Sequence, residues 1–192
     1  MIILKIGGSI LTKKDAPESE VDSVNLKRIA LEIKKSLDNS SKELVIVHGA
    51  GSFGHPPAKK YKIGQAFDKD EYPQKRIGFC EIQNAVKKLN MLICEEFISH
   101  GLPVIAVPAS SFITANSKRI TDGNLDIFKK YLSKGFIPII YGDVVLDDDL
   151  EFCVISGSVI DSPLITAAVI FVLLSVFSVV GFRLNVGLHI SA

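Results

Sequence analysis

Four short apolar runs, separated from one another by segments of helical or polar character, constrain the fold of this chain most strongly. They cover residues 2–6, 44–48, 103–107 and 136–141. Runs of this length, rich in Ile, Val and Leu, predict buried strands. Strands that alternate with helices predict an α/β fold, here a three-layer αβα sandwich with a mainly parallel sheet and right-handed crossovers.

Apolar residues at helical spacing predict the connecting helices. These helices cover residues 26–37, about 75–100 and 125–132. Asp22 or Ser23 can cap the first helix, and Gly101 and Gly135 stop the other two. Residues 56–73 are polar and show no periodicity, so they predict a mobile loop that contains one helical turn at most.

Two glycine-bearing turns close the first two strands and are the chief candidates for a binding site. Gly7-Gly8-Ser9 follows the first strand, and the stretch from Gly49 to His55 follows the second. Glycine lacks a Cβ and tolerates positive φ, so backbone N–H groups in such turns can approach an anion. Ligands of open parallel sheets bind beyond the carboxyl ends of the strands, where both turns lie. Together the turns predict a site for several phosphate groups, although each can also be a plain tight connection.

Charged side chains near the turns support this prediction, and each also has a plainer interpretation. Lys5 lies within the first strand, where an unpaired buried charge is costly, so its ammonium should reach the polar end of the strand. Lys14 follows the first turn and fits a solvated loop equally well. His55 can donate a hydrogen bond to a phosphate or lie on the surface beside two prolines. His48 ends a buried strand and is predicted to be structural.

Two other kinds of site are disfavoured. The second turn matches GxGxxG, but in dinucleotide-binding folds that motif opens a helix and the next strand ends in an acidic residue about 20 positions on. Here the motif runs into two prolines and a lysine-rich loop, and Asp68 and Asp70 have no strand-like context. Residues 144–155 predict a β-hairpin with an acidic turn at 147–149, which is more typical of a solvated turn than of a metal site.

Composition excludes several classes of function. The net charge of +1 gives no field that would attract nucleic acid, so no such partner is expected. The three cysteines lack metal-like spacing, and their odd number favours a reducing, cytoplasmic location over a disulfide framework. The first strand begins at residue 2, so we expect no signal peptide.

An abrupt change in composition divides the chain in two. Of the 22 Lys and Arg and the 21 Asp and Glu residues, only Arg183 lies beyond residue 161. We expect one domain over residues 1–157 and an atypical apolar tail over residues 158–192. Residues 164–182 carry no charge and are long enough for a transmembrane helix, which would anchor the chain. Alternatively, the tail is the product of a frameshift or truncated gene, or it fills a core that would otherwise be bare.

Five stretches carry a combined signature. They are residues 4–12 (LKIGGSILT), 47–55 (VHGAGSFGH), 108–112 (PASSF), 141–144 (YGDV) and 155–157 (ISG). Together they resemble the amino-acid kinase superfamily, and within it the archaeal isopentenyl phosphate kinase branch. The histidine after Gly-Ser-Phe-Gly, here His55, separates that branch from the acetylglutamate, aspartate and uridylate kinases. The resemblance spans about residues 1–157 and implies an amino-acid kinase-like fold.

The resemblance implies an activity and the residues that serve it. It implies transfer of the γ-phosphoryl group of ATP onto isopentenyl phosphate, with Mg²⁺ held largely by the phosphates and no protein metal ligand. Lys14 would stabilise charge on the transferring group. The residues implied to contact the ATP phosphates are Lys5, Gly7, Gly8, Ser9 and Gly54. Those implied to hold the substrate phosphate are Ala50, His55 and Gly157.

Two further expectations come with the resemblance. The helix over residues 75–100 would wall an isoprenoid pocket, with Phe79, Cys80 and Gln83 as candidate lining residues. The superfamily commonly dimerises through its N-terminal half, so a homodimer is expected.

The chain departs from the family pattern after Gly157. Family members continue with Ser-Gly-Asp-Asp and a second half that binds adenine and ribose, whereas residues 156–159 here read Ser-Gly-Ser-Val. The acid expected to orient the catalytic lysines is therefore absent from this position. Two alternatives stay open: a non-catalytic phosphate-binding remnant, and another enzyme of the superfamily that acts on a carboxylate or a different small phosphate.

Overall fold

The computed structural model describes residues 1–13, 19–39 and 42–156, all of which belong to one compact unit of the chain. Lys14, Gly157 and the apolar tail, including the predicted membrane helix over residues 164–182, lie outside the described residues. None of the helices that are described combines the length and the apolar composition needed to cross a membrane. The predicted boundary between the two parts of the chain stays a prediction.

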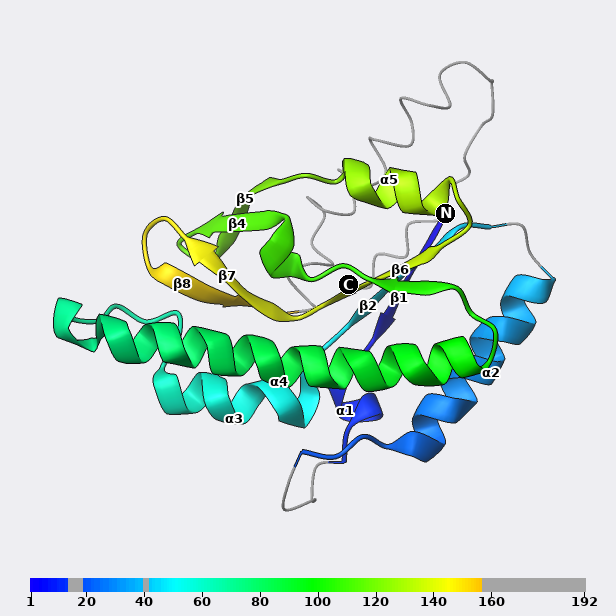
Figure 1. Cartoon of the computed structure of the whole chain (residues 1–192), viewed down its shortest axis with the longest axis horizontal. Coiled ribbons are helices and arrows are strands. Elements are labelled where there is room, and N and C mark those ends of the chain that lie inside the picture. The colour runs from blue at the N-terminus through cyan, green and yellow to red at the C-terminus, as the bar shows by residue number, and fades with distance from the viewer. Residues whose placement is uncertain (14–18, 40–41, 157–192) are drawn as a thin grey trace, which may run out of the picture. The chain divides into compact units, whose positions relative to one another are not determined.

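A four-stranded parallel sheet forms the base of the fold (Figure 1). In spatial order its strands are β1 (Ile2–Ile6), β2 (Leu44–His48), β6 (Ile137–Tyr141) and β3 (Val104–Ala106). β2 and β6 are buried along their whole length, as expected for central strands covered on both faces. Ile6 pairs with His48, and His48 pairs with Tyr141, so these three strands end at one edge of the sheet. The predicted α/β fold with a mainly parallel sheet is confirmed.

A second sheet contains both parallel and antiparallel strand pairs. In spatial order its strands are β5 (Arg119–Gly123), β4 (Ile113–Asn116), β7 (Asp143–Asp147) and β8 (Glu151–Ile155). The β7–β8 hairpin was predicted, whereas the β4–β5 hairpin was not. The two strands of β4–β5 contain no apolar run, and their turn uses Ser117 and Lys118, with φ of 48° and 65°, where a sequence search would look for glycine.

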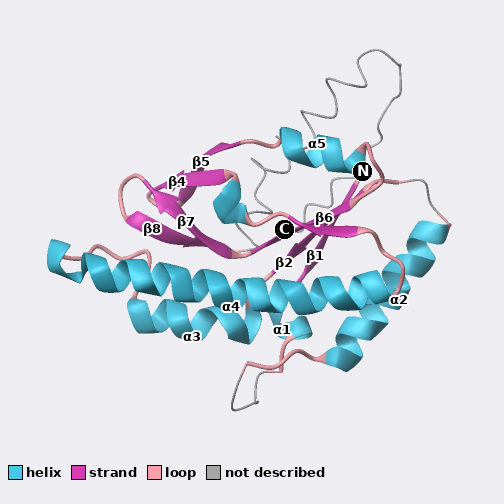
Figure 2. Cartoon of the chain, in the orientation of Figure 1, coloured by secondary structure: helices cyan, strands magenta, loops and turns pink. Residues whose placement is uncertain are grey.

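Helices lie on both sides of the parallel sheet (Figure 2). On one side are α1 (Gly8–Leu11), α2 (Ser23–Asp38), α3 (Gly51–Tyr61) and α4 (Tyr72–Ser99), and on the other is α5 (Asp126–Leu132). Two short 3-10 helices, η1 (Lys69–Glu71) and η2 (Ala109–Ser111), precede α4 and β4. Asp22 caps α2, because its carboxylate accepts a hydrogen bond from the Asn25 N–H at 3.0 Å.

The core fills the space between α2, α4 and the parallel sheet. The apolar stripe of α2 faces inward, and α4 contributes its own stripe with helical spacing. Buried members of this core include Leu26, Ala30, Ile46, Leu89, Ile93, Phe97 and Ile139. These contacts hold α2 and α4 against the parallel sheet.

Helix α3 corrects the prediction of a loop over residues 56–73. The helix runs through Pro56 and Pro57, although a proline in a helix interior lacks the N–H that would bond the carbonyl four residues earlier. The carbonyl of Ser52, which Pro56 cannot serve, instead accepts a hydrogen bond from the Ser19 hydroxyl at 2.8 Å. A side chain 33 residues away therefore replaces the missing helical bond, which no local sequence signal reveals.

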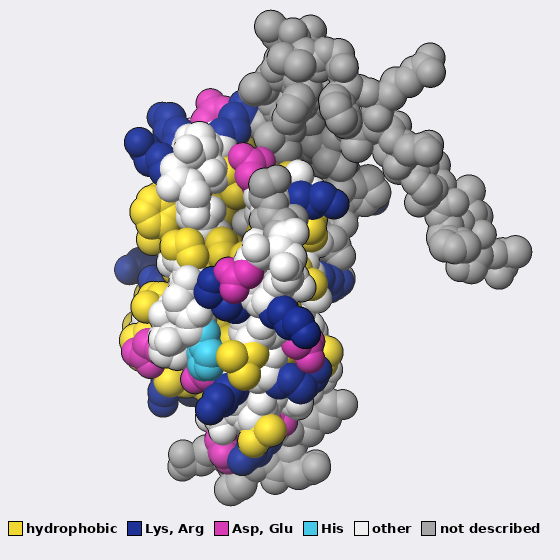
Figure 3. Space-filling model, turned by 90° about the vertical axis from the view of Figure 1, so that its right-hand side faces the viewer, with side chains coloured by type: hydrophobic (Ala, Val, Ile, Leu, Met, Phe, Trp, Pro, Cys, Tyr) yellow, Lys and Arg dark blue, Asp and Glu magenta, His cyan; other side chains and the backbone are white. Residues whose placement is uncertain are grey.

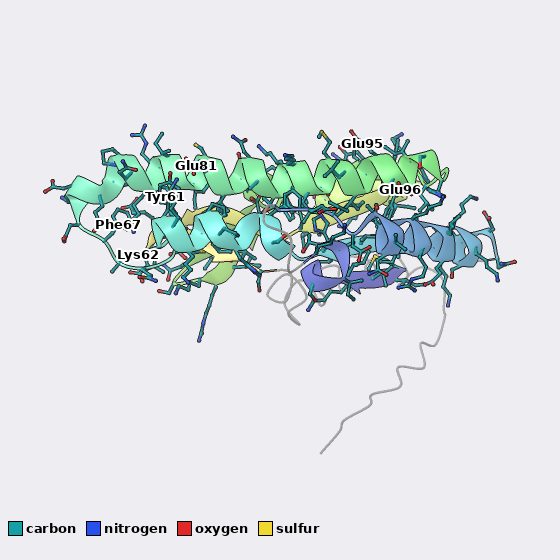
Figure 4. The ribbon with its side chains drawn as sticks, turned by 90° about the horizontal axis from the view of Figure 1, so that it is seen from below. Tyr61, Lys62, Phe67, Glu81, Glu95 and Glu96 are labelled. Carbon is teal, nitrogen blue, oxygen red and sulfur yellow. The ribbon has the colours of Figure 1, made fainter. Side chains whose placement is uncertain are left out.

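The C-terminal end of α3 is fastened to α4 (Figure 4). Tyr61 packs so closely over Gly78 that a Cβ there would lie 2.4 Å from the Tyr61 ring, and its hydroxyl donates to Glu81 at 2.8 Å. The ammonium of Lys75, which is 5% exposed, donates to the Tyr61 carbonyl at 3.0 Å. A cation at the last carbonyls of a helix is favoured by the helix dipole, so Lys75 caps α3.

The acidic turn of the β7–β8 hairpin is not simply solvated. Asp147 is 3% exposed, and its carboxylate accepts hydrogen bonds at 2.7–3.1 Å from four backbone N–H groups. The donors are Ser117, Lys118, Asp149 and Leu150. Burial raises the pKa of Asp147, but hydrogen bonds from the backbone of Lys118, Leu150 and Asp149 and from the Cys153 thiol outweigh burial and lower the pKa to about 2. Asp147 thus joins the β4–β5 turn to the β7–β8 turn, a role that the sequence did not reveal.

Replacing this carboxylate is expected to destabilise the fold. In Asp147→Asn one carboxylate oxygen becomes an NH₂ group that cannot accept, which should cost about 1–3 kcal/mol of unfolding free energy in urea titrations at pH 7. Because the folded pKa is about 2 against an ordinary 3.8, the parent keeps this stabilisation above pH 3.8 and loses it as the pH falls through 2. In Asp147→Asn the free energy of unfolding should lack this particular decrease at low pH. The exposed neighbour in Asp148→Asn should stay within about 0.5 kcal/mol of the parent.

At the Ser52 carbonyl the Ser19 hydroxyl replaces the N–H that Pro56 lacks. This compensation can be tested by a double-mutant cycle that measures the free energy of unfolding. Ser19→Ala should cost about 0.5–1.5 kcal/mol in the parent, because the Ser52 carbonyl loses its donor. In the Pro56→Ala background the restored helical N–H serves that carbonyl, so Ser19→Ala should be close to neutral. Equal costs in both backgrounds would contradict the compensation.

Candidate active site

A cavity of about 320 Å³ lies where the strands of the parallel sheet end, between α3, α4 and β8. Its polar lining comes from both glycine turns and from side chains beside them. The members of this polar part are Lys5, Gly7, Gly8, Ser9, Gly49, Ala50, Gly51, Gly54, His55, Asp143 and Ser156. The structure therefore brings together every residue predicted to contact phosphate that it describes.

The two glycine turns touch each other directly. A Cβ at Gly8 would lie 2.4 Å from the Gly51 nitrogen, and a Cβ at Gly49 would lie 2.9 Å from the Gly8 nitrogen. Real Cβ atoms do not approach backbone so closely, so both positions require glycine. Gly7 differs, because a Cβ there would meet nothing nearer than 3.8 Å. Contact between the turns thus accounts for Gly8 and Gly49, while the open space at Gly7 borders the cavity.

The second turn opens α3. The prediction that this GxGxxG motif runs into a loop, which had counted against a dinucleotide site, is therefore wrong. Gly51 is the first helical residue and has a φ of +53°, and Gly54 lies so near α4 that a Cβ would be 3.0 Å from Val86. The N-terminus of α3 therefore borders the cavity, a favourable place for an anion. A dinucleotide site is still disfavoured on other grounds, because α3 leads through η1 into α4 and not into a strand.

The two charged side chains of the site reach the cavity from different elements. Lys5 lies in β1, an edge strand of the described parallel sheet, and it is exposed. The prediction placed Lys5 in a buried strand, which is wrong for β1, although its position at the cavity agrees. His55 is also exposed and lies on the first turns of α3. Lys14 and Gly157 lie outside the described residues, so their placement stays a prediction.

The other half of the cavity is apolar. Its lining residues are Ala58, Ile82, Val86, Val154 and Ile155. Ile82 and Val86 share one face of α4 at a spacing of four residues. The lining expected from Phe79, Cys80 and Gln83 is not found: Phe79 packs against Phe152 with ring centroids 5.3 Å apart, Cys80 is exposed, and Gln83 donates to the Ser110 hydroxyl at 2.9 Å.

Asp143 is a cavity residue that the sequence-based site lacks. It is 1% exposed and accepts hydrogen bonds from the N–H groups of Ser110 at 3.1 Å and Val144 at 2.9 Å. Burial raises the pKa of this carboxyl group above its ordinary value, against the effect of these donors. The available signal was its position: an acidic residue that follows Gly142 at the carboxyl end of a buried strand.

His48 has the structural role that was predicted. It is fully buried, its Nδ1 lies 3.0 Å from the Gly49 carbonyl and its Nε2 lies 3.2 Å from Asn90 Oδ1, and its ring stacks on Tyr141. Burial lowers the pKa of His48, so the ring is neutral near pH 7. The side chain thereby supports the second glycine turn from behind.

The described residues offer no ready-made metal centre, since no group of three or more His, Cys, Asp or Glu side chains gathers among them. The face shown in Figure 3 mixes basic, acidic and apolar side chains without a field of a single sign. The chemistry of the site is therefore set by backbone N–H groups, one lysine, one histidine and one buried aspartate beside an apolar wall. Such a set binds and orients an anion that has an apolar end.

Comparison with known proteins identifies relatives of this site. The model of the amino acid kinase family matches residues 1–162. An isopentenyl phosphate kinase of Methanothermobacter thermautotrophicus is 47% identical over 160 residues, which cover 82% of this chain and 59% of that protein. One of Methanocaldococcus jannaschii is 42% identical, with coverage of 82% and 61%. The chain thus spans about three fifths of the length of these curated relatives.

Solved structures agree with the sequence relatives. A structure of isopentenyl phosphate kinase has a TM-score of 0.79 at 44% identity and covers 82% of this chain and 64% of that chain. A product complex of the Thermoplasma acidophilum isopentenyl phosphate kinase has a TM-score of 0.65 at 29% identity, with coverage of 83% and 62%.

The contact between the turns predicts different outcomes at two adjacent glycines. Gly8→Ala forces a Cβ against the Gly51 backbone and should cost about 2–3 kcal/mol of unfolding free energy. Gly7→Ala is the matched control: its φ of −62° suits alanine and the Cβ has room, so its cost should stay below about 0.5 kcal/mol. Equal destabilisation, measured by urea titration, would show that the turns are not in contact.

Proposed function

Because this chain belongs to the amino acid kinase family, we propose that it carries the acceptor-binding part of an isopentenyl phosphate kinase. That enzyme transfers the γ-phosphoryl group of ATP onto isopentenyl phosphate and releases isopentenyl diphosphate and ADP. The observation that carries the proposal is the two-sided cavity, in which an apolar wall faces two glycine turns and His55. Isopentenyl phosphate has the same two sides, a phosphate dianion and a short branched hydrocarbon.

The acceptor is proposed to bind with its phosphate at the second turn. His55 and the backbone around Ala50, at the positive end of α3, would hold this phosphate. Its five-carbon chain would then lie against Ile82, Val86 and Ile155, where burial of apolar surface adds affinity. Gly157, outside the described residues, is proposed to complete the phosphate site.

The ATP phosphates are proposed to lie at the first turn. Lys5 and the backbone of Gly7, Gly8 and Ser9 border this part of the cavity. Gly54, in the second turn, lines the same cavity and is proposed to contact these phosphates as well. Phosphoryl transfer requires alignment and neutralisation of charge more than covalent catalysis, so lysine and backbone N–H groups are the suitable chemistry. Lys14 would stabilise the transferring group. Mg²⁺, when bound, would neutralise phosphate oxygens and be held largely by those oxygens.

The part of the chain that would hold adenine and ribose has no counterpart in the described residues. Ser158 stands where the family has an aspartate, so a non-catalytic phosphate-binding protein is the second candidate. The two candidates differ in turnover: the kinase forms isopentenyl diphosphate from ATP, and the binding protein only binds isopentenyl phosphate. Calorimetry together with a coupled assay of ADP release separates them.

Three further features of the family pattern belong to this proposal. The complete three-layer αβα architecture and a homodimer are proposed because the resemblance to the family implies them. A cytoplasmic location is supported by the cysteines, because all three lie in the described residues and all are free thiols.

Replacing His55 should separate the proposed substrate from other acceptors of the family. His55→Ala should lower kcat/KM for isopentenyl phosphate about 10- to 100-fold, since one hydrogen bond to a charged phosphate is lost. His100→Ala removes a histidine at the end of α4 and serves as the control, with activity unchanged. An unchanged kcat/KM in His55→Ala would overturn the assignment of His55 to the acceptor phosphate.

A further inference from the structure

The hydroxyl group of Thr12 bonds to both glycine turns. It donates to the Gly8 carbonyl at 2.9 Å and accepts from the Ser52 N–H at 3.1 Å. Thr12 is 4% exposed, so water does not compete freely for either bond. Gly8 belongs to the turn proposed for ATP, and Ser52 lies in the first turn of α3, which carries His55 to the acceptor phosphate.

The surroundings of Thr12 fix the hydroxyl in this bridging position. The Thr12 N–H donates to the Gly8 carbonyl at 3.1 Å, and Thr12 pairs with Val21 in an isolated antiparallel bridge. A Cβ on Gly51 would lie 2.6 Å from the hydroxyl oxygen, so the absence of a side chain on that glycine makes room for the threonine. The hydroxyl therefore acts as donor on one side and acceptor on the other, which a methyl group cannot do.

Both turns need such a bridge because glycine leaves their backbones free to move. The contact between Gly8 and Gly51 limits how closely the turns approach, but van der Waals contact alone does not prevent them from separating. His48 and Ser19 each bond to the second turn from other directions. The Gly49 N–H donates to the Ile6 carbonyl at 3.1 Å, which holds the start of the second turn to the end of β1. Thr12 adds a side-chain link between the two turns themselves.

We propose that Thr12 is a positioning residue that sets the separation between the donor and acceptor phosphates. The proposal rests on the proposed function, because it assigns one phosphate to each turn. Thr12 acts through the Gly8 carbonyl and the Ser52 N–H and does not itself contact the reacting groups. Reaction rates of aligned groups are sensitive to displacements of about 1 Å, so a loosened bridge should lower the rate of transfer more than it weakens binding.

The test compares Thr12→Val, which has nearly the same shape and lacks the hydroxyl, with Thr12→Ser, which keeps it. Thr12→Val should lower kcat about 10- to 100-fold while KM for isopentenyl phosphate changes less than about threefold. Thr12→Ser should keep kcat within about threefold of the parent. Val104→Ala removes buried apolar volume in β3, outside the cavity, and controls for loss of stability; its kcat should match that of the parent.

Three outcomes decide the proposal. If Thr12→Val has the kcat of the Val104→Ala control, the proposal is overturned while the proposed function stands. If Thr12→Val does not fold, Thr12→Ala replaces it, because the smaller side chain leaves space for water at the two orphaned groups, and the same kinetic criterion applies. If the parent chain shows no turnover, the proposed function fails. The bridge is then judged by binding of two anions, because inorganic phosphate occupies one turn and inorganic triphosphate can span both. Thr12→Val should bind phosphate within about threefold of Thr12→Ser but triphosphate about tenfold more weakly, and equal Kd values for triphosphate would overturn the proposal.

Discussion

The site depends on the close approach of two backbone turns that side chains would prevent. Gly8 and Gly49 face each other across a distance that leaves no room for a Cβ on either. This approach is possible because β1 and β2 are adjacent parallel strands in register, so that both turns leave the sheet at the same level. The described backbone groups proposed to hold phosphate lie on one turn or the other, so the distance between the proposed phosphate positions follows from the sheet.

Buried polar groups hold the elements around this contact. His48 bonds behind the second turn, Asp147 joins the two hairpins, and Asp143 ties η2 to the start of β7. Each of these groups has hydrogen-bond partners that offset the cost of burial. The directions of the pKa changes reflect the balance in each case: burial prevails at His48 and Asp143, and hydrogen-bond donors prevail at Asp147.

Local sequence patterns predicted the parts of the fold whose causes are local. The apolar runs of β2 and β6, the stripe of α2 and the glycines of both turns are visible in the sequence, and so is the meeting of Lys5 and His55 at one end of the sheet. α3 was not predicted because the donor that replaces Pro56 comes from Ser19, far away in the chain. The burial of Asp143 and Asp147 arises in the same way, from partners on other elements. What the sequence missed is therefore mostly tertiary hydrogen bonding.

The strand order has a consequence for the synthesis of the chain. β6 lies between β2 and β3, yet it is the last of the four parallel strands to be made. While the ribosome completes the chain, β2 can pair with β1 but its second edge has no partner until residue 141 emerges. An unpaired apolar edge favours association with other chains. The nascent chain therefore passes through a long interval in which its central strand needs protection, which makes slow translation around α4 and β3 a risk and an early encounter with a chaperone an advantage.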